Sequence, residues 1–107
     1  MKLNAEERAS ELAPLRAAGW VHNPTRDAIT KSFDFPNFIA AFGWMTQCAI
    51  WAEKWLHHPE WTNVYNRVEV TLTTHDADGL TALDIKLAHK MDALASGLNT
   101  KQKEQNP

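Results

Sequence analysis

Apolar and polar residues alternate in two stretches of the chain, residues 28–35 and 64–72, and this period of two predicts two strands with one buried face each. The apolar positions are Ile29, Phe33 and Phe35 in the first stretch and Val64, Val68, Val70 and Leu72 in the second. Asn66 falls on the apolar side of the second stretch and indicates a bend. A sheet that is apolar on one side is typical of antiparallel strands with helices on a single face.

Three helices are predicted where apolar residues recur every three or four positions. Asn4 and Glu7 have the spacing of a capping box, so the first helix begins there, and Pro14 is expected to kink or end it. The second helix runs over residues 36–55, and the third follows the cap Thr81. The third helix is expected to bury Leu83, Leu87, Met91, Leu94 and Leu98.

The second helix carries two apolar stripes, which are rotated by about 100° from each other around the helix axis. The first stripe consists of Phe38, Phe42, Met45, Ala49, Ala52 and Leu56, and the second of Ala41, Trp44, Cys48, Trp51 and Trp55. One stripe can cover the sheet. The stripe with three tryptophans is expected to meet a second subunit, because large exposed apolar patches are rare on monomers.

The length of 107 residues fits one domain of the α+β class, which we place at residues 1–98. A short strand at residues 20–22 and a polar loop at residues 73–79 complete it. Residues 99–107 are polar without apolar periodicity, and we expect them to form a frayed tail.

Charge and composition exclude several functional classes. Eleven Lys and Arg against 13 Asp and Glu give a net charge of −2, which argues against direct nucleic-acid binding. No apolar run approaches the roughly 20 residues that span a membrane, and the first residues do not form a secretory signal. The single cysteine, Cys48, allows no internal disulfide and fits a reducing compartment, so we expect a cytoplasmic protein.

The five histidines suggest proton-transfer chemistry. His57 and His58 lie between the second helix and the following strand, and His75 precedes a loop that ends near Asp84. Imidazole titrates near neutral pH, so it both gives and takes protons there. Loops at the ends of rigid elements are common places for sites.

Structural interpretations of the same residues remain open at this stage. His57, His58 and His75 also fit polar connectors, and Asp84 lies three residues after Thr81, the spacing of a capping box. A zinc site with three histidines is a further possibility, although the spacing is not a standard ligand pattern. Three other polar residues are read as exposed surface positions: His22, Glu53 and His89. No nucleophile motif or phosphate-binding glycine loop is present.

Several fixed spacings resemble the pterin-4a-carbinolamine dehydratase family. The family pattern is a glutamate, then His-His-Pro after three intervening residues, an aromatic residue, a histidine and a spaced aspartate. The chain fits it at Glu53, His57, His58, Pro59, Tyr65, His75 and Asp84. Further matching text is found at 17–20, 26–29, 41–46, 60–66 and 79–81, so the likeness covers residues 5–98.

The resemblance implies a four-stranded antiparallel sheet with three helices on one face, assembled as a homodimer or homotetramer through the face of helix 36–55. It implies an enzyme that removes water from 4a-hydroxytetrahydropterin, the product left by aromatic amino acid hydroxylases, and gives quinonoid dihydropterin. Neither a metal nor an organic cofactor is implied. Some animal relatives also act as dimerisation partners of a transcription factor, so a protein-binding role of the tryptophan-rich stripe is the alternative.

The resemblance also assigns roles to individual residues. His57, His58 and His75 form the acid/base group, and Asp84 orients or polarises one of them. The residues implied in substrate binding are Trp20, Glu53, Leu56, Thr73, Thr74 and Asp76, with Trp20 lining the cleft. Leu56 is a departure, because relatives often carry a polar residue there.

Overall fold

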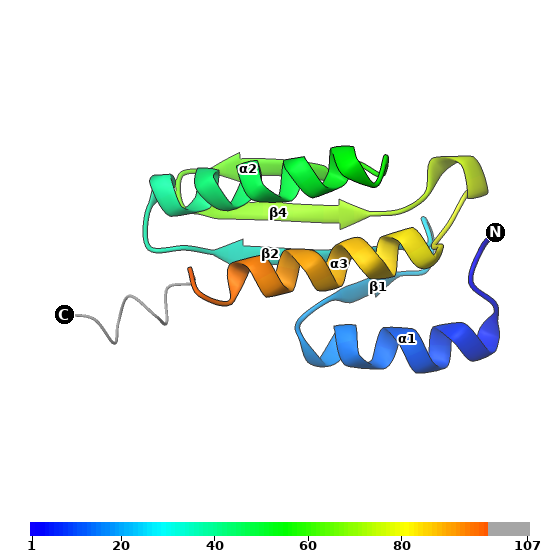
Figure 1. Cartoon of the computed structure of the whole chain (residues 1–107). Coiled ribbons are helices and arrows are strands. Elements are labelled where there is room, and N and C mark those ends of the chain that lie inside the picture. Colours follow the sequence, from blue (N-terminus) through cyan, green and yellow to red (C-terminus); the bar gives the residue numbers. More distant parts are fainter. Residues whose placement is uncertain (99–107) are drawn as a thin grey trace.

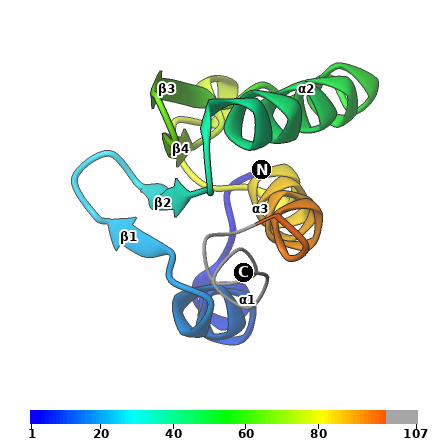
Figure 2. The same cartoon turned by 90° about the vertical axis from the view of Figure 1, so that its left-hand side faces the viewer.

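The fold is a four-stranded antiparallel sheet with three helices on one of its faces (Figures 1 and 2), as the sequence and the resemblance predict. The computed structural model describes residues 1–98, and the predicted tail at 99–107 lies outside them. The sheet has the order β1-β2-β4-β3. The elements are α1 (Ala5–Ala17), β1 (Val21–Asn23), β2 (Ala28–Asp34), α2 (Phe38–Lys54), β3 (Glu60–Val64), β4 (Arg67–Leu72), the 3-10 turn η1 (His75–Ala77) and α3 (Ala82–Ala95). Within these residues no helix is both long and apolar enough to cross a bilayer.

The predicted strand at residues 64–72 is instead a hairpin of β3 and β4. Val64 pairs with Arg67, and Tyr65 and Asn66 form the turn between them, with Tyr65 in the left-handed region at φ +50°. Asn66 marks the chain reversal, because its backbone carbonyl and its side-chain amide both bond the backbone of Phe35 at 2.9 Å. The strand that the sequence did not define is therefore β3, which exposes three of its five residues and carries no apolar alternation.

Pro14 does not end the first helix as predicted. Helix α1 continues to Ala17, and the backbone N–H of Ala18 bonds the carbonyl of Pro14. Pro14 is exposed and lies near the end of the helix, so the proline removes one helical hydrogen bond at a position that solvent reaches. The capping box of Asn4 and Glu7 is present, as expected.

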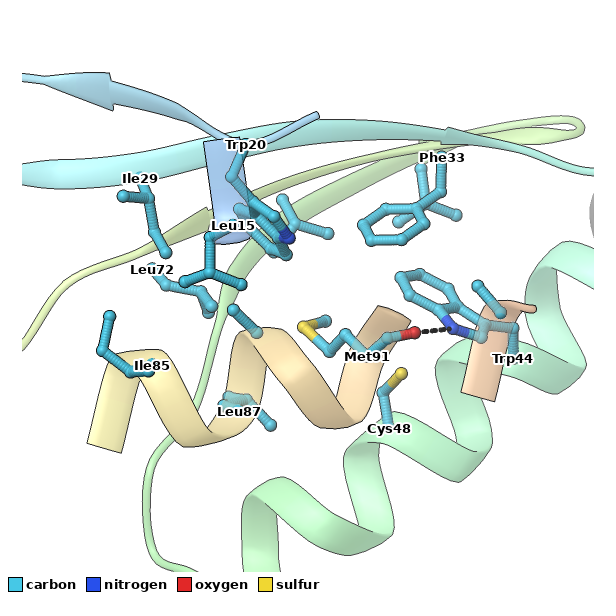
Figure 3. Close-up of a cluster of buried hydrophobic side chains, with 14 of the residues drawn as sticks. Leu15, Trp20, Ile29, Phe33, Trp44, Cys48, Leu72, Ile85, Leu87 and Met91 are labelled. Atoms are coloured by element: carbon cyan, nitrogen blue, oxygen red, sulfur yellow. Dashed lines mark hydrogen bonds between the residues drawn. The ribbon is translucent and has the colours of Figure 1, made fainter. Parts of the chain in front are cut away.

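The tryptophan-containing stripe of α2 faces the core rather than a second subunit. Trp44 is fully buried, packs 4.4 Å from the ring of Phe33, and donates a hydrogen bond from Nε1 to the carbonyl of Met91 (Figure 3). Trp51 and Trp55 are half-buried against lysines of α2 and α3. The sequence showed two stripes correctly, but the wrong one was assigned to the outside.

The buried face of α3 departs from the prediction in two ways: Leu94 and Leu98 are only half-buried against the core, and the first buried position is shifted by one residue. Leu83 is exposed, whereas the next residue, Asp84, is fully buried. Leu87 and Met91 are buried as expected, together with Ile85, Ala88 and Ala95. The buried carboxylate in place of a leucine is the first structural sign of a functional site.

Candidate active site

The end of α2 sets the directions of the two adjacent histidines. The N–H of His57 bonds the carbonyl of Ala52 and the N–H of Leu56 bonds that of Glu53, the pair of bonds of a Schellman motif. Leu56 occupies its left-handed position at φ +53°. The reversal turns His57 into the protein and leaves His58 exposed, so the neighbouring imidazoles point to different environments.

Leu56 is a costly residue at this position, and replacing it with asparagine is expected to stabilise the protein. Its side chain is 76% exposed, so its removal loses little apolar burial, whereas asparagine tolerates the left-handed region better. We expect Leu56→Asn to raise the free energy of unfolding by about 0.5–1 kcal/mol, which is roughly 2–6 °C in Tm for a domain of this size.

Thermal unfolding monitored by circular dichroism measures this effect. Leu83→Asn is the matched control, because Leu83 is also an exposed leucine but lies in regular helix, where asparagine is a poorer helix former. An unchanged or lowered Tm for Leu56→Asn would show that the left-handed position carries no cost.

Asp84 serves at once as a helix cap and as the partner of an imidazole. Its Oδ2 accepts hydrogen bonds from the N–H of Thr81 at 2.9 Å and from the hydroxyl of Thr74 at 2.8 Å. Its Oδ1 lies 2.5 Å from Nε2 of His57. Asp84 is therefore a helix cap, as its spacing from Thr81 predicts, and its other carboxylate oxygen contacts an imidazole.

His57 has one ring nitrogen committed and the other available. Because an ionised carboxylate only accepts, its contact with Nε2 places the proton of a neutral His57 on that nitrogen. Nδ1 has no hydrogen-bond partner within residues 1–98. Because no side-chain nitrogen or oxygen of these residues is both buried and unpaired, the unpaired Nδ1 itself is accessible. Nδ1 is therefore open to a ligand, although the residue is buried.

His58 is paired in the same sense but at the surface. Its Nε2 lies 2.9 Å from Oε1 of Glu53, one turn earlier along the chain at the end of α2. Both side chains are largely exposed. Glu53, interpreted as a solvated residue or as a substrate contact, is thus also a histidine partner.

His75 begins the turn η1 and is the most exposed of the three imidazoles, with 76% of its side chain accessible. Its Nε2 lies 3.1 Å from Oε2 of Glu60 on β3. Arg26 binds the same carboxylate through two hydrogen bonds of 2.9 Å and thereby lowers the pKa of Glu60. Sequence patterns assign no role to Glu60 or Arg26, because only the pairing of β3 with β4 brings Glu60 near the loop of His75.

The threonines before His75 tie its loop to the rest of the site. Thr74 bonds both Asp84 and the hydroxyl of Thr81, and Thr73 is buried and donates to the carbonyl of Asp27 at 3.0 Å. Asp76 is exposed in η1. A polar hollow of about 430 Å³ lies beside this loop, and its lining includes Thr73, Thr74, His75, Arg26, Asp27 and Lys2.

A larger hollow of about 610 Å³ lies at the β3–β4 hairpin, and it is lined by none of the residues that the sequence proposed for the site. Both hollows are lined by polar side chains, but of the two only the hollow beside His75 includes an imidazole, a group that moves protons near neutral pH. Chemistry, rather than size, therefore favours the loop of His75.

Trp20 does not belong to this group, which corrects the expectation that it lines the cleft. The side chain is 2% exposed and packs in the core beside Phe33 (Figure 3). Its Nε1 donates a hydrogen bond to Asp92 at 3.0 Å. Asp92 lies two helical turns beyond Asp84 on α3. Neither face of the indole is free to stack on a ligand.

The remaining histidines separate. His89 is exposed, as expected, but His22 is half-buried and lies 2.8 Å from the carboxylate of Asp27. Among residues 1–98, no three histidine, cysteine or carboxylate side chains are grouped so as to hold a metal ion.

The fold and these contacts define a small α+β domain with a buried carboxylate–imidazole pair, Asp84 and His57. His58 follows His57 directly, and Thr74, which precedes His75, bonds Asp84. The sequence profile of the pterin 4 alpha carbinolamine dehydratase family matches residues 1–94. The chain therefore belongs to this family.

Similar proteins agree with that membership. Proteins of Roseobacter denitrificans and Ruegeria pomeroyi, both provisionally named pterin-4-alpha-carbinolamine dehydratases, are 63% and 61% identical over 94 and 93 residues. The matches cover 88% and 87% of this chain and 96% of each relative.

Solved structures give the same fold. A crystal structure of a transcriptional coactivator/pterin dehydratase from Brucella melitensis is 52% identical, with a TM-score of 0.81 over 90% of this chain and 100% of the other. A pterin dehydratase-like protein, described as a RuBisCO assembly factor in the alpha-carboxysome, is 20% identical, with a TM-score of 0.64 over 73% of this chain and 90% of the other. That second likeness concerns the fold alone.

Proposed function

We propose that the protein dehydrates 4a-hydroxytetrahydropterin to quinonoid dihydropterin in the cytoplasm, where it recycles the pterin used by an aromatic amino acid hydroxylase. The observation that carries the proposal is the buried His57–Asp84 pair with an open Nδ1, in a chain of the pterin carbinolamine dehydratase family. The free, buried thiol of Cys48 supports a reducing compartment.

The reaction needs proton transfer in two places. The bond between C4a and its hydroxyl breaks, and the leaving oxygen takes a proton from an acid to depart as water. The adjacent ring nitrogen gives its proton to a base, and its electrons form the new C=N bond. No electrons are gained or lost, so imidazoles that donate and accept protons near neutral pH supply what the step requires.

We assign these transfers to His57, His58 and His75, with Asp84 holding His57. Two of the residues named for substrate binding, Leu56 and Thr74, directly precede His57 and His75, and Thr73 lies one residue before Thr74. We propose that the backbone of these three residues meets the pterin ring. Glu53 and Asp76 flank the same two segments. Trp20 has no part in this binding, because it is buried in the core.

The test is the decay of the 4a-carbinolamine absorbance generated by a hydroxylase. Wild-type protein is expected to accelerate the decay, and a His57→Ala, His58→Ala, His75→Ala triple variant to lose on the order of 10²-fold or more of that acceleration. His89→Ala is the control, because His89 is exposed and makes no contact with the site. No acceleration by wild type, or equal acceleration by the triple variant, would refute the proposal. Stoichiometric metal in the purified protein would favour the zinc alternative.

We further propose that the chain forms a homodimer or homotetramer through the outer face of α2, defined by Phe38, Ile39, Phe42 and Ile50. All four side chains are exposed in the single subunit and lie on the side of the helix opposite Trp44. A different protein partner is the alternative occupant, and the description of the Brucella relative as a transcriptional coactivator/pterin dehydratase supports testing it.

A further inference from the structure

The turn between β1 and β2 packs against the loop of His75 at both ends of that loop. The backbone carbonyl of Asp27 accepts a hydrogen bond from Thr73 at 3.0 Å, and its Oδ2 accepts one from the N–H of Leu80 at 3.1 Å. Thr73 precedes η1 and Leu80 follows it. One residue outside the histidine motifs therefore fixes the entry and the exit of the segment that carries His75.

Asp27 is itself held rigidly. Arg8 of α1 gives its carboxylate two hydrogen bonds of 2.7 Å, and Nε2 of His22 lies 2.8 Å from the same group. The bonds from Arg8, and to a lesser extent those from His22 and Leu80, lower its pKa far below the ordinary value of 3.8 against the opposing effect of burial. The carboxylate is therefore charged at every pH at which the reaction is run.

Gly79 shows how closely the carboxylate meets the loop. A Cβ at this position would lie 2.3 Å from Oδ2 of Asp27, closer than side chains approach one another. Two hydrogen bonds from Arg8 hold the carboxylate in place, so a side chain at position 79 would displace either the carboxylate or the loop. The β1–β2 turn and the loop of His75 are therefore in close contact at Gly79.

The imidazole of His75 is restrained through the residue before Asp27. Arg26 holds Glu60 in a two-bond pair, and the Oε2 of Glu60 lies 3.1 Å from Nε2 of His75. Among residues 1–98 Glu60 is the only side chain that forms an ion pair with this ring, and the side chain of His75 is largely exposed. Nδ1 is left free, as it is in His57.

We propose that Arg26, Asp27 and Glu60 are positioning residues for His75. Asp27 fixes the backbone of the loop, and Arg26 fixes the ring through Glu60, so that Nδ1 of His75 is presented to the substrate in one orientation. The catalytic consequence rests on the proposed function, whereas the orientation of the ring is a property of the free protein. Holding a reacting group in one geometry lowers the barrier without new chemistry.

The activity test uses Glu60→Gln, which keeps the shape of the side chain and removes its charge. We expect kcat for carbinolamine dehydration to fall by about 5-fold, the upper range for an exposed charged contact, with KM changed by less than about 2-fold. In the His75→Ala background the same substitution is expected to have no further effect. Glu69→Gln is the matched control, because Glu69 lies on the neighbouring strand, is exposed and makes no ion pair within residues 1–98.

Asp27→Asn tests the contact of the Asp27 carboxylate with the backbone of Leu80, again by comparing variants with and without His75. It is expected to lower kcat in the wild-type background and to have no further effect on kcat when His75 is already alanine, whatever its effect on the melting temperature. An unchanged kcat for Glu60→Gln, or losses for both variants of the same size with and without His75, would overturn the proposal.

The orientation of the ring is measured without substrate. In protein labelled with ¹⁵N and ¹³C at histidine, three-bond couplings across the side chain are expected to report one dominant rotamer of His75 in the wild type and averaging in Glu60→Gln. Averaging already in the wild type would overturn the positioning role. An inactive wild type with a fixed ring would instead refute the dehydratase assignment and leave the positioning intact.

Discussion

Replacing Asp84 with asparagine is expected to lower kcat for carbinolamine dehydration by on the order of 10²-fold. Oδ2 of Asp84 accepts from Thr74 and Thr81, so the oxygen of an asparagine stays there and its NH₂ group turns toward His57. Nε2 of His57 then has to accept a hydrogen bond, and the proton of the neutral ring moves to Nδ1. The nitrogen open to the substrate loses its ability to act as a base.

The same substitution is expected to destabilise the fold by about 1–3 kcal/mol, because it replaces a buried charged acceptor with a neutral one. Asp92→Asn separates this loss from the catalytic one. Asp92 lies on the same helix and accepts bonds from Trp20 and Lys31, but it does not contact a histidine. We expect it to cost a similar amount of stability and to leave kcat within about 2-fold.

Two measurements decide the outcome for Asp84. Chemical denaturation gives the loss of stability, and ¹⁵N chemical shifts of the His57 ring give its tautomer. If Asp84→Asn is no more impaired in kcat than Asp92→Asn, Asp84 is a helix cap only, and the structural interpretation of the Thr81–Asp84 spacing is sufficient.

The elements with a strong periodic pattern were predictable from the sequence, and those fixed by tertiary contacts were not. The period-two pattern around Phe33 and the cap at Thr81 both correspond to observed elements. The sequence indicates a bend at Asn66, but the turn at Tyr65 and Asn66 lacks glycine and is held by two hydrogen bonds between Asn66 and Phe35, which follows β2 and lies 31 residues earlier in the chain. No local pattern in the sequence contains that partner.

The site divides in the same way. The adjacency of His57 and His58, together with their likeness to a family, indicated the chemistry. The partner of each imidazole depends on packing, since Glu60 reaches His75 only because β3 and β4 pair, and Asp84 reaches His57 only because α3 packs beside the end of α2. Trp20 was misplaced because a matching motif does not distinguish a cleft residue from a core residue.

The two stripes of α2 lead to the second large expected effect, which is dissociation of the assembly by Phe42→Glu combined with Ile50→Glu. Periodicity cannot show which stripe faces the sheet, but the structure buries Trp44 and leaves Phe42 54% and Ile50 63% exposed. If a second copy covers this face, burying each new carboxylate costs about 2 kcal/mol, and the two together weaken association by roughly 10³-fold. The fold of the subunit should persist, since neither side chain is in its core.

Size-exclusion chromatography with light scattering measures the assembly, with the wild type expected above the 12.1 kDa of one chain and the double variant at that mass. Trp51→Glu is the informative comparison. The sequence predicted that it weakens assembly, but Trp51 is half-buried and lies 4.1 Å from the ammonium group of Lys90 on α3. We therefore now expect it to lower the melting temperature and to leave the oligomer intact. The reverse result, with Trp51→Glu dissociating the assembly and the double variant not, would place the interface on the tryptophan side of α2 after all.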